Sequence, residues 1–196
     1  MIDAAAHETL FTFARSHNGW LDQPVSDDEL RRVYELARMG PTALNAQPMR
    51  VVFVRSPEAK ARLKPALAAS NVDKVMAAPA CAIVAYDLEF QRNLPRTFPH
   101  RPEVKDGFEG DANLAKRQVF CMRNGTLQGA YLIRAARAIG LDAGPMSGFD
   151  NAKVDAEFFA GTSWRSNFLC GLGHGDASKV FDRLPRLPFE ETCRIL

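Results

Sequence analysis

The longest helical pattern in the chain, from Ala112 to Ile139, constrains the fold more than any other feature. Its apolar residues recur at helical spacing, and Gly140 ends it. Gly125 and Gly129 lie within it at i, i+4, although each glycine costs ~1 kcal/mol in a helix interior. The pair therefore predicts the close approach of a second element. Two sources remain open, a seam between two copies of the chain and a crowded core within one copy.

The remaining patterns predict one domain over residues 1–196 that is α+β, with helices outnumbering strands. Ser26 and Glu29 form a capping box for a helix that ends at Gly40, where the glycine is expected to accept a left-handed cap. Ser56 and Asp150 are expected to cap two further helices. The expected helices are 3–15, 27–38, 57–67 and 152–159; the expected strands are 51–54, 81–86 and 167–172; 141–149 is a loop or short strand, 71–74 a basic turn, and 95–110 a long mobile loop.

Composition excludes several classes of protein. Hydrophobic residues make up 46% and charged residues 24%, so global disorder is not expected, and a net charge of +2 does not favour a nucleic-acid partner. No apolar run approaches the ~20 residues that a membrane helix needs, and the first residues do not resemble a secretion signal. We therefore expect a cytoplasmic protein. Cys81 and Cys170 lie in apolar runs, and the scattered cysteines predict neither disulfides nor a zinc site.

Common catalytic motifs are missing from the sequence. The run from Gly171 to Asp176 lacks the third glycine of a dinucleotide-binding turn, because Asp176 stands in its place. The sequence contains neither a G-x-S-x-G nucleophile turn nor an H-E-x-x-H metal motif, and no metal site is expected. If the chain is an enzyme, a cofactor is expected to carry the chemistry.

Four polar clusters are candidates for cofactor binding. Arginine and lysine side chains suit a phosphate, and amide side chains suit the edge of a heterocyclic ring. The alternative for each cluster is a solvated surface or a loop stabilised by Asn and Thr. The clusters are Arg15-Ser16-His17-Asn18, the segment 41–47 with Asn45 and Gln47, Asn71 with Lys74, and Arg183-Leu184-Pro185-Arg186.

Taken in order, these clusters resemble the FMN-dependent nitroreductase-like family. Residues 41–48 resemble its P-[ST]-x-x-N-x-Q-P signature, and Arg15-Ser16 resembles the start of its R-S-x-R phosphate motif. Residues 145–150 resemble its P-x-x-G-F-D segment, and 183–185 its R-x-P. The resemblance extends over about residues 10–190. It implies an intertwined homodimer with a mostly antiparallel sheet surrounded by helices, and one FMN in each of two clefts between the subunits.

The resemblance also implies which residues bind the cofactor. Arg15, Ser16, Asn71, Lys74 and Arg183 would hold the phosphate, and Thr42, Asn45 and Gln47 would face the ring from the partner subunit. The loop 145–148 would present backbone groups to the electron-accepting edge of the ring. The full candidate set is Arg15, Ser16, Asn18, Pro41, Thr42, Asn45, Gln47, Asn71, Lys74, Pro145, Met146, Ser147, Gly148, Arg183 and Arg186.

Two positions depart from the family pattern. Asn18 stands where the second arginine of R-S-x-R is expected, and Phe181 stands where a basic residue is expected. The phosphate site would lose positive charge, which Arg186 would restore. The sequence leaves open which of Arg183 and Arg186 contacts the phosphate.

At finer grain, residues 16–20, 144–150 and 183–187 resemble the RutE subgroup of malonic semialdehyde reductases. That likeness implies NAD(P)H-dependent reduction of malonic semialdehyde to 3-hydroxypropanoate in pyrimidine degradation. The alternatives are a broad nitro or quinone reductase, a flavin-binding module without turnover, and an interaction protein that binds no flavin. Thr42 and the segment 95–110 are expected substrate contacts by position, and no catalytic side chain is assigned.

Overall fold

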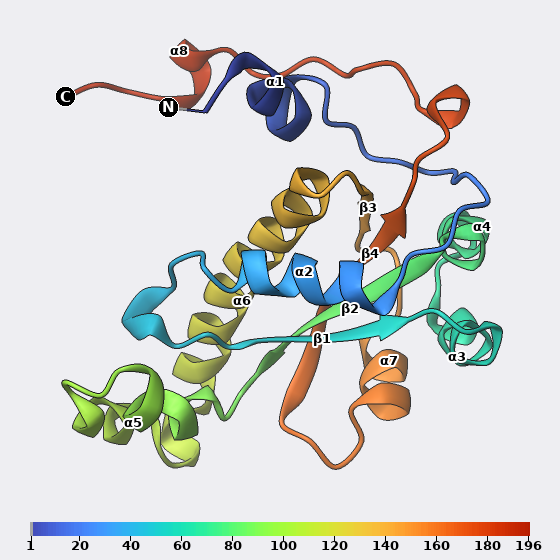
Figure 1. The fold of residues 1–196 in the computed structure, drawn as a ribbon. Coiled ribbons are helices and arrows are strands. Elements are labelled where there is room, and N and C mark those ends of the chain that lie inside the picture. Colours follow the sequence, from blue (N-terminus) through green and yellow to red (C-terminus); the bar gives the residue numbers. More distant parts are fainter. Residues whose placement is uncertain (1) are drawn as a thin grey trace.

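The computed structural model describes residues 2–196 and has one four-stranded antiparallel sheet (Figure 1). Its strand order is β1-β2-β4-β3, and each neighbouring pair is antiparallel. The predicted α+β class is therefore confirmed. The segment expected to be a loop or short strand supplies the fourth strand, β3. The strands are β1 Met49–Val54, β2 Ala80–Asp87, β3 Asp142–Met146 and β4 Trp164–Gly173.

Helices cover both faces of this sheet (Figure 1). Five of them have seven or more residues: α2 Asp27–Ala37, α3 Pro57–Leu63, α4 Ala69–Ala77, α6 Leu114–Ala138 and α7 Asn151–Phe158. The short helices are α1 Ala4–His7, α5 Leu94–Thr97 and α8 Phe189–Thr192. The segments of other helix types are η1 Glu8–Thr12, η2 Ala43–Asn45, η3 Lys64–Ala66, η4 Phe90–Asn93, η5 Pro102–Phe108, η6 Asp111–Asn113 and η7 Ala177–Lys179.

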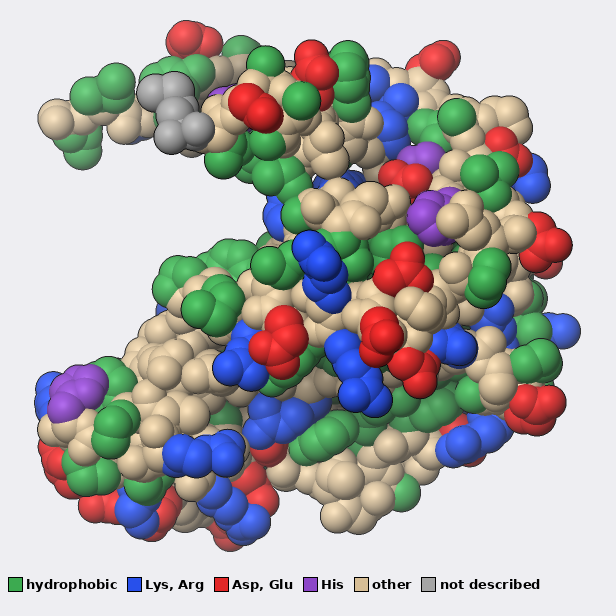
Figure 2. All heavy atoms as spheres, in the orientation of Figure 1, with side chains coloured by type: hydrophobic (Ala, Val, Ile, Leu, Met, Phe, Trp, Pro, Cys, Tyr) green, Lys and Arg blue, Asp and Glu red, His purple; other side chains and the backbone are tan. Residues whose placement is uncertain are grey.

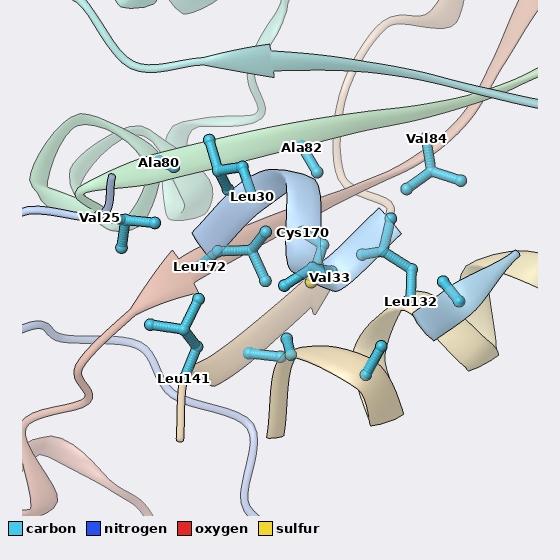
Figure 3. Close-up of a cluster of buried hydrophobic side chains, with 14 of the residues drawn as sticks. Val25, Leu30, Val33, Ala80, Ala82, Val84, Leu132, Leu141, Cys170 and Leu172 are labelled. Atoms are coloured by element: carbon cyan, nitrogen blue, oxygen red, sulfur yellow. The ribbon is translucent and has the colours of Figure 1, made fainter. Parts of the chain in front are cut away.

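Strand β2 is buried along its whole length and separates two hydrophobic cores. Successive side chains of a strand point to opposite faces. Ala80, Ala82 and Val84 therefore pack with α2 and α6, where Figure 3 shows Leu30, Val33 and Leu132 meeting them. The intervening residues of β2 pack with α3, α4 and α7 on the other face. Burial raises the pKa of the Cys81 and Cys170 thiols to about 12, as expected for cysteines that act as apolar core residues.

The two glycines of α6 are explained by crowding within one chain. A Cβ atom on Gly129 would lie 2.5 Å from the ring of Phe168, and one on Gly125 would lie 3.0 Å from the Cβ of Tyr86. Both glycines therefore allow the helix to approach the sheet closely, so the crowded-core alternative holds. Gly40 also serves packing, since a Cβ there would lie 2.1 Å from the ring of Tyr131. Its φ is not positive, so the expected left-handed cap is wrong.

The helix-start signals of the sequence are confirmed. Ser26 and Glu29 make both hydrogen bonds of the capping box, and the side chains of Ser56 and Asp150 cap α3 and α7. Three other predictions are wrong. Residues 71–74 lie within α4 and do not form a turn. Residues 95–110 form short helices, which buried Leu94 and Phe108 anchor to the body. The first helix is short and continues as a π-helical turn.

The two ends of the chain form a terminal arm, defined here as residues 2–15 and 181–196. Both segments run along one end of the molecule beyond the sheet (Figure 1), and Figure 2 shows a recess between this arm and the body. Every residue from 181 onward is exposed. Among residues 2–196, no helix is long and apolar enough to cross a membrane.

Candidate cofactor site

The Arg15–Asn18 loop is fixed to strand β3. The backbone N–H of His17 donates to the carbonyl of Ala143 over 3.1 Å, and Ser16 pairs with Ala143 as a parallel bridge. A Cβ atom on Gly144 would lie 2.3 Å from the His17 carbonyl oxygen, so only glycine allows this approach. The arrangement buries His17 and leaves Ser16 exposed. The loop thus presents a hydroxyl outward from a rigid backbone.

Sequence reasoning did not assign a role to His17, although its side chain helps to hold this loop. Its Nε2 lies 3.2 Å from Oδ1 of Asp142, and the whole residue is 8% exposed to solvent. The other oxygen of Asp142 accepts a hydrogen bond of 2.8 Å from the backbone N–H of Gly175. A Cβ atom on Gly175 would lie 1.8 Å from His17 Nδ1. Histidine, aspartate and glycine together join the loop to the ends of β3 and β4.

Helix α4 connects this loop to the 145–148 loop. Buried Asn71 donates its side-chain amide to the carbonyl of Gly148 over 3.0 Å, and the backbone N–H of Ala68 donates to the same oxygen. The indole of Trp20 donates to the carbonyl of Lys74 over 3.2 Å. The Lys74 ammonium group makes no hydrogen bond or ion pair with any residue of the described range 2–196. Helix α4, which carries the cluster of Asn71 and Lys74, therefore contacts both Trp20, just after the Arg15–Asn18 loop, and the segment 145–148.

Of the predicted 145–148 loop, Pro145 and Met146 form the end of β3 and pair with β4, so only Ser147 and Gly148 lie beyond the strand. These two residues offer unused backbone donors. Within residues 2–196, the N–H groups of Ser147 and Gly148 donate to no acceptor. Pro145 and Ser147 are exposed, whereas the side chain of Met146 packs on the core beneath. Donors beside a ring that gains electrons stabilise its added negative charge. The loop therefore has the character that the resemblance implies for residues at the electron-accepting edge.

The two C-terminal arginines, Arg183 and Arg186, make different contacts. Arg183 donates to the carbonyls of Thr12 and Ala14 over 2.6 and 3.3 Å, and Arg15 donates in return to the carbonyl of Phe181. Arg186 donates only within its own turn, to the carbonyls of Leu184 and Pro185. Arg183 is thus the one of the two that contacts the segment leading into the Arg15–Asn18 loop.

The segment 41–47 adopts an uncommon backbone. Leu44, Asn45 and Gln47 have φ values of 57°, 46° and 45°, in the left-handed region that non-glycine residues rarely adopt. Side chains maintain this shape: Gln47 donates its backbone N–H to the Thr42 hydroxyl and its amide to Asn45. Asn45 in turn donates to the carbonyl of Thr97 over 2.8 Å. Such conformations persist where their surroundings determine them and cluster at functional sites.

Helix α6 supplies further support for this segment that sequence reasoning missed. Asn124 accepts from the N–H of Ala43 over 2.9 Å, Gln128 accepts from the N–H of Met49 over 2.9 Å, and Tyr131 donates to the carbonyl of Pro41 over 3.1 Å. The available signal was the spacing of these three polar residues, which places them on one face of the predicted long helix.

Within one chain, the segment 41–47 contacts the middle of α6, and the Arg15–Asn18 loop contacts its C-terminal end. Asn124 and Tyr131 contact the first, whereas Arg137 donates to the carbonyl of Arg15 over 2.9 Å. Six residues separate Tyr131 from Arg137, which at ~1.5 Å per residue is ~9 Å along the helix axis. No hydrogen bond joins the segment 41–47 to the other three clusters within residues 2–196 of one copy.

A groove of about 930 Å³ extends from Gln47 along β1. Within the sheet, β1 pairs only with β2, so its other edge is free of strand partners among the described residues. The groove lies between α2 and α5 and is lined by side chains of mixed character, including Tyr34, Arg50, Phe53, Arg96 and Trp164.

The fold is shared with solved proteins. The crystal structure described as "putative nitroreductase ydfN" from Bacillus subtilis has a TM-score of 0.88 at 21% identity, covering 99% of this chain and 100% of that chain. A second one, from Exiguobacterium sibiricum, was solved in complex with FMN and has a TM-score of 0.85 at 20% identity, covering 100% of this chain and 99% of that one. These likenesses show a nitroreductase-like fold.

Sequence comparison then gives the family. Residues 12–174 match the model described as the Nitroreductase family. "Putative NADH dehydrogenase/NAD(P)H nitroreductase HadB" of Ralstonia pickettii is 60% identical over 187 residues, which cover 95% of each protein. A relative of the same description from Cupriavidus pinatubonensis is 57% identical over 188 residues and 96% of each protein. The chain belongs to the nitroreductase family.

Proposed function

We propose that the protein is an FMN-dependent oxidoreductase that uses NAD(P)H to reduce a small organic acceptor. The observation that supports this proposal is the placement of arginines and unused backbone donors at the two ends of β3, because Ser16, next to Arg15, pairs with Ala143 of β3, and Ser147 and Gly148 directly follow that strand. Arg15 and Arg183 lie at one end, and the N–H groups of Ser147 and Gly148 at the other. A phosphate at the basic end and a ring at the loop match this donor set. The printed names of the relatives and the FMN complex of a structural neighbour support the same assignment.

The chain's own residues would bind and orient the cofactor. Arg15, Ser16, Asn18, Lys74 and Arg183 would hold the phosphate, while Asn71 maintains the 145–148 loop through its bond to Gly148. FMN, when bound, supplies the capacity to accept a hydride from nicotinamide and pass it on. Ser147 and Gly148 would stabilise negative charge at the ring edge with their backbone N–H groups. Arg186, which bonds within its own turn, is not required for this assignment.

The active assembly proposed here is a homodimer. The family resemblance implies that the segment 41–47, with Pro41, Thr42, Asn45 and Gln47, faces the ring held by the partner subunit. In agreement, no hydrogen bond joins this segment to the other three clusters within residues 2–196 of one copy. Exposed apolar side chains support a second copy. Phe181, Leu184 and Leu187 of the terminal arm are each 73% exposed, and Met39 of the body is 77% exposed. Burying such surface favours association.

The identity of the electron acceptor distinguishes a malonic semialdehyde reductase from a broad nitro or quinone reductase. The RutE-like segments favour malonic semialdehyde, whereas the names of the relatives favour a nitro compound or a quinone. We expect NAD(P)H oxidation under anaerobic conditions with at least one of three acceptors compared side by side: malonic semialdehyde, a nitroaromatic compound and a quinone. A higher kcat/KM for malonic semialdehyde, with 3-hydroxypropanoate as the product, would assign the narrow function. A higher value for the other two would assign the broad reductase.

Two outcomes contradict enzymatic function. FMN binding without NAD(P)H oxidation by any acceptor would make the protein a flavin-binding module. If the protein binds no flavin at all, the polar clusters are solvated surface and not a cofactor site. Denatured protein with free FMN is the control, because it measures the NAD(P)H oxidation that free flavin supports without the folded protein.

A further inference from the structure

The last turns of α6 carry two arginines that no motif predicted. Arg137 donates Nη2 to the carbonyl of Arg15 over 2.9 Å, and the Arg134 guanidinium carbon lies 4.2 Å from the centroid of the Phe11 ring. Both side chains are partly buried. Nε of Arg137 and Nη1 of Arg134 are buried without any hydrogen-bond partner in the described range 2–196. Buried N–H groups without acceptors are uncommon in folded proteins.

Four guanidinium groups thus gather on the short segment from Phe11 to Arg15. Arg134 and Arg137 contact it from the body, Arg183 donates to its carbonyls, and Arg15 belongs to it. Across residues 2–196, none of the four has a carboxylate within 4.0 Å. Burial, and then the positive charge of Arg134, lower the pKa of Arg137. Like charges that are partly desolvated and unpaired destabilise the site until an anion binds there.

We propose that Arg137, assisted by Arg134, is a positioning residue for the cofactor phosphate. The two side chains supply the positive charge that the family pattern places at Asn18 and Phe181. This inference rests on the proposed function, because it takes the FMN phosphate as the dianion that the four arginines attract. Arg137 acts in two ways: its charge attracts the phosphate, and its hydrogen bond fixes the backbone of Arg15.

A purely structural role for Arg137 makes a different prediction. Glutamine at this position keeps an N–H donor for the Arg15 carbonyl but has no charge, and methionine has neither. If the hydrogen bond alone matters, Arg137→Gln preserves FMN affinity and Arg137→Met lowers the stability of the cofactor-free protein. If the charge matters, both variants lose FMN affinity, and removing one of four like charges leaves the cofactor-free protein at least as stable as the parent.

The experiment titrates FMN and riboflavin into the cofactor-free full-length parent, Arg137→Gln, Arg137→Met, Arg134→Gln and the control Arg186→Gln, following flavin fluorescence. Riboflavin has the ring without the phosphate. We expect Arg137→Gln to raise the Kd for FMN about tenfold or more while riboflavin affinity changes less than about twofold. Arg134→Gln should act in the same direction, and Arg186→Gln should change neither affinity.

Thermal unfolding with inorganic phosphate gives a readout that needs no flavin. Phosphate should raise the Tm of the parent, because a ligand that binds only the folded state stabilises it, and should raise that of Arg137→Gln less. Equal FMN affinity in Arg137→Gln and the parent would overturn the inference while the proposed function stands. Equal losses of FMN and riboflavin affinity would also overturn it. A parent that binds neither flavin but is stabilised by phosphate through Arg137 would refute the proposed function and support an anion site.

Discussion

Replacing Arg15 and Arg183 together with alanine is expected to lower the affinity for FMN on the order of a hundredfold or more. The two side chains bind each other's segments, since Arg15 donates to Phe181 and Arg183 donates to Thr12. Each would add a charge-assisted hydrogen bond to a phosphate, worth ~1.5–3 kcal/mol. The double substitution removes both of these bonds to the phosphate and also the contacts that join the two segments of the terminal arm. Fluorescence titration of the cofactor-free variant with FMN measures the effect.

Two controls isolate the phosphate in that experiment. Riboflavin should bind the parent and the double variant with similar affinity, because it lacks the group that the arginines contact. Arg186→Ala should bind FMN like the parent, because Arg186 contacts only its own turn. An unchanged Kd for FMN in the double variant would contradict the assignment of the basic end of the site.

The second large effect is expected for Gly144→Ala, which should lower the free energy of unfolding by about 2–3 kcal/mol. The new Cβ atom would lie 2.3 Å from the carbonyl oxygen of His17. This oxygen belongs to backbone that is tied to β3 by the His17 N–H and by the imidazole–Asp142 contact, so it cannot move away at low cost. For a chain of this size the loss corresponds to a fall in Tm of roughly 4–12 °C.

Gly107→Ala is the matched control for that change. A Cβ atom there meets only the Lys116 ammonium nitrogen, at an ordinary contact distance of 3.8 Å, and the φ of Gly107 is not positive. Its stability should therefore stay within about 0.5 kcal/mol of the parent. Chemical denaturation of both variants checks the contrast. Equal stability of Gly144→Ala and the parent would mean that the Arg15–Asn18 loop does not lie against β3 as described.

Much of the fold was readable from local signals. The capping side chains of Ser26, Ser56 and Asp150 act on residues three positions away, so a local pattern suffices to place the helix starts. Helix α4 lacked such a signal, because Ala68 stands at its N-cap and makes no side-chain bond. The asparagine and charged residues of its sequence favoured a turn, and only burial of Asn71 and Val75 against the body shows why a helix forms.

The segment 95–110 differs from its predicted loop structure for a related reason. Its prolines indicated an irregular loop, yet Pro95 and Pro102 occupy the first turns of short helices, where a missing N–H costs nothing. Phe108 then packs edge-on against Phe90 and holds the segment on the body. Aromatic residues distant in sequence thus determine the structure of a segment that local composition describes as mobile.

The residues of the candidate site also fall into those that local sequence motifs predict and those that only the folded structure shows. Residues within contiguous motifs, such as Arg15 and Gly148, could be listed from the sequence as candidates. The residues that hold those motifs in place could not, because they act across the fold: His17 meets Asp142, and Arg137 meets Arg15. Polar and charged residues on the buried side of a long predicted helix are the signal that points to such partners.

The most direct test of the central claim is gel filtration of the protein mixed with FMN, with light scattering and visible absorbance recorded together. The account predicts that flavin absorbance co-elutes with a particle of two chains and bleaches when NAD(P)H is added without oxygen. Protein that elutes free of flavin, or flavin that stays oxidised in the presence of NAD(P)H, would contradict it.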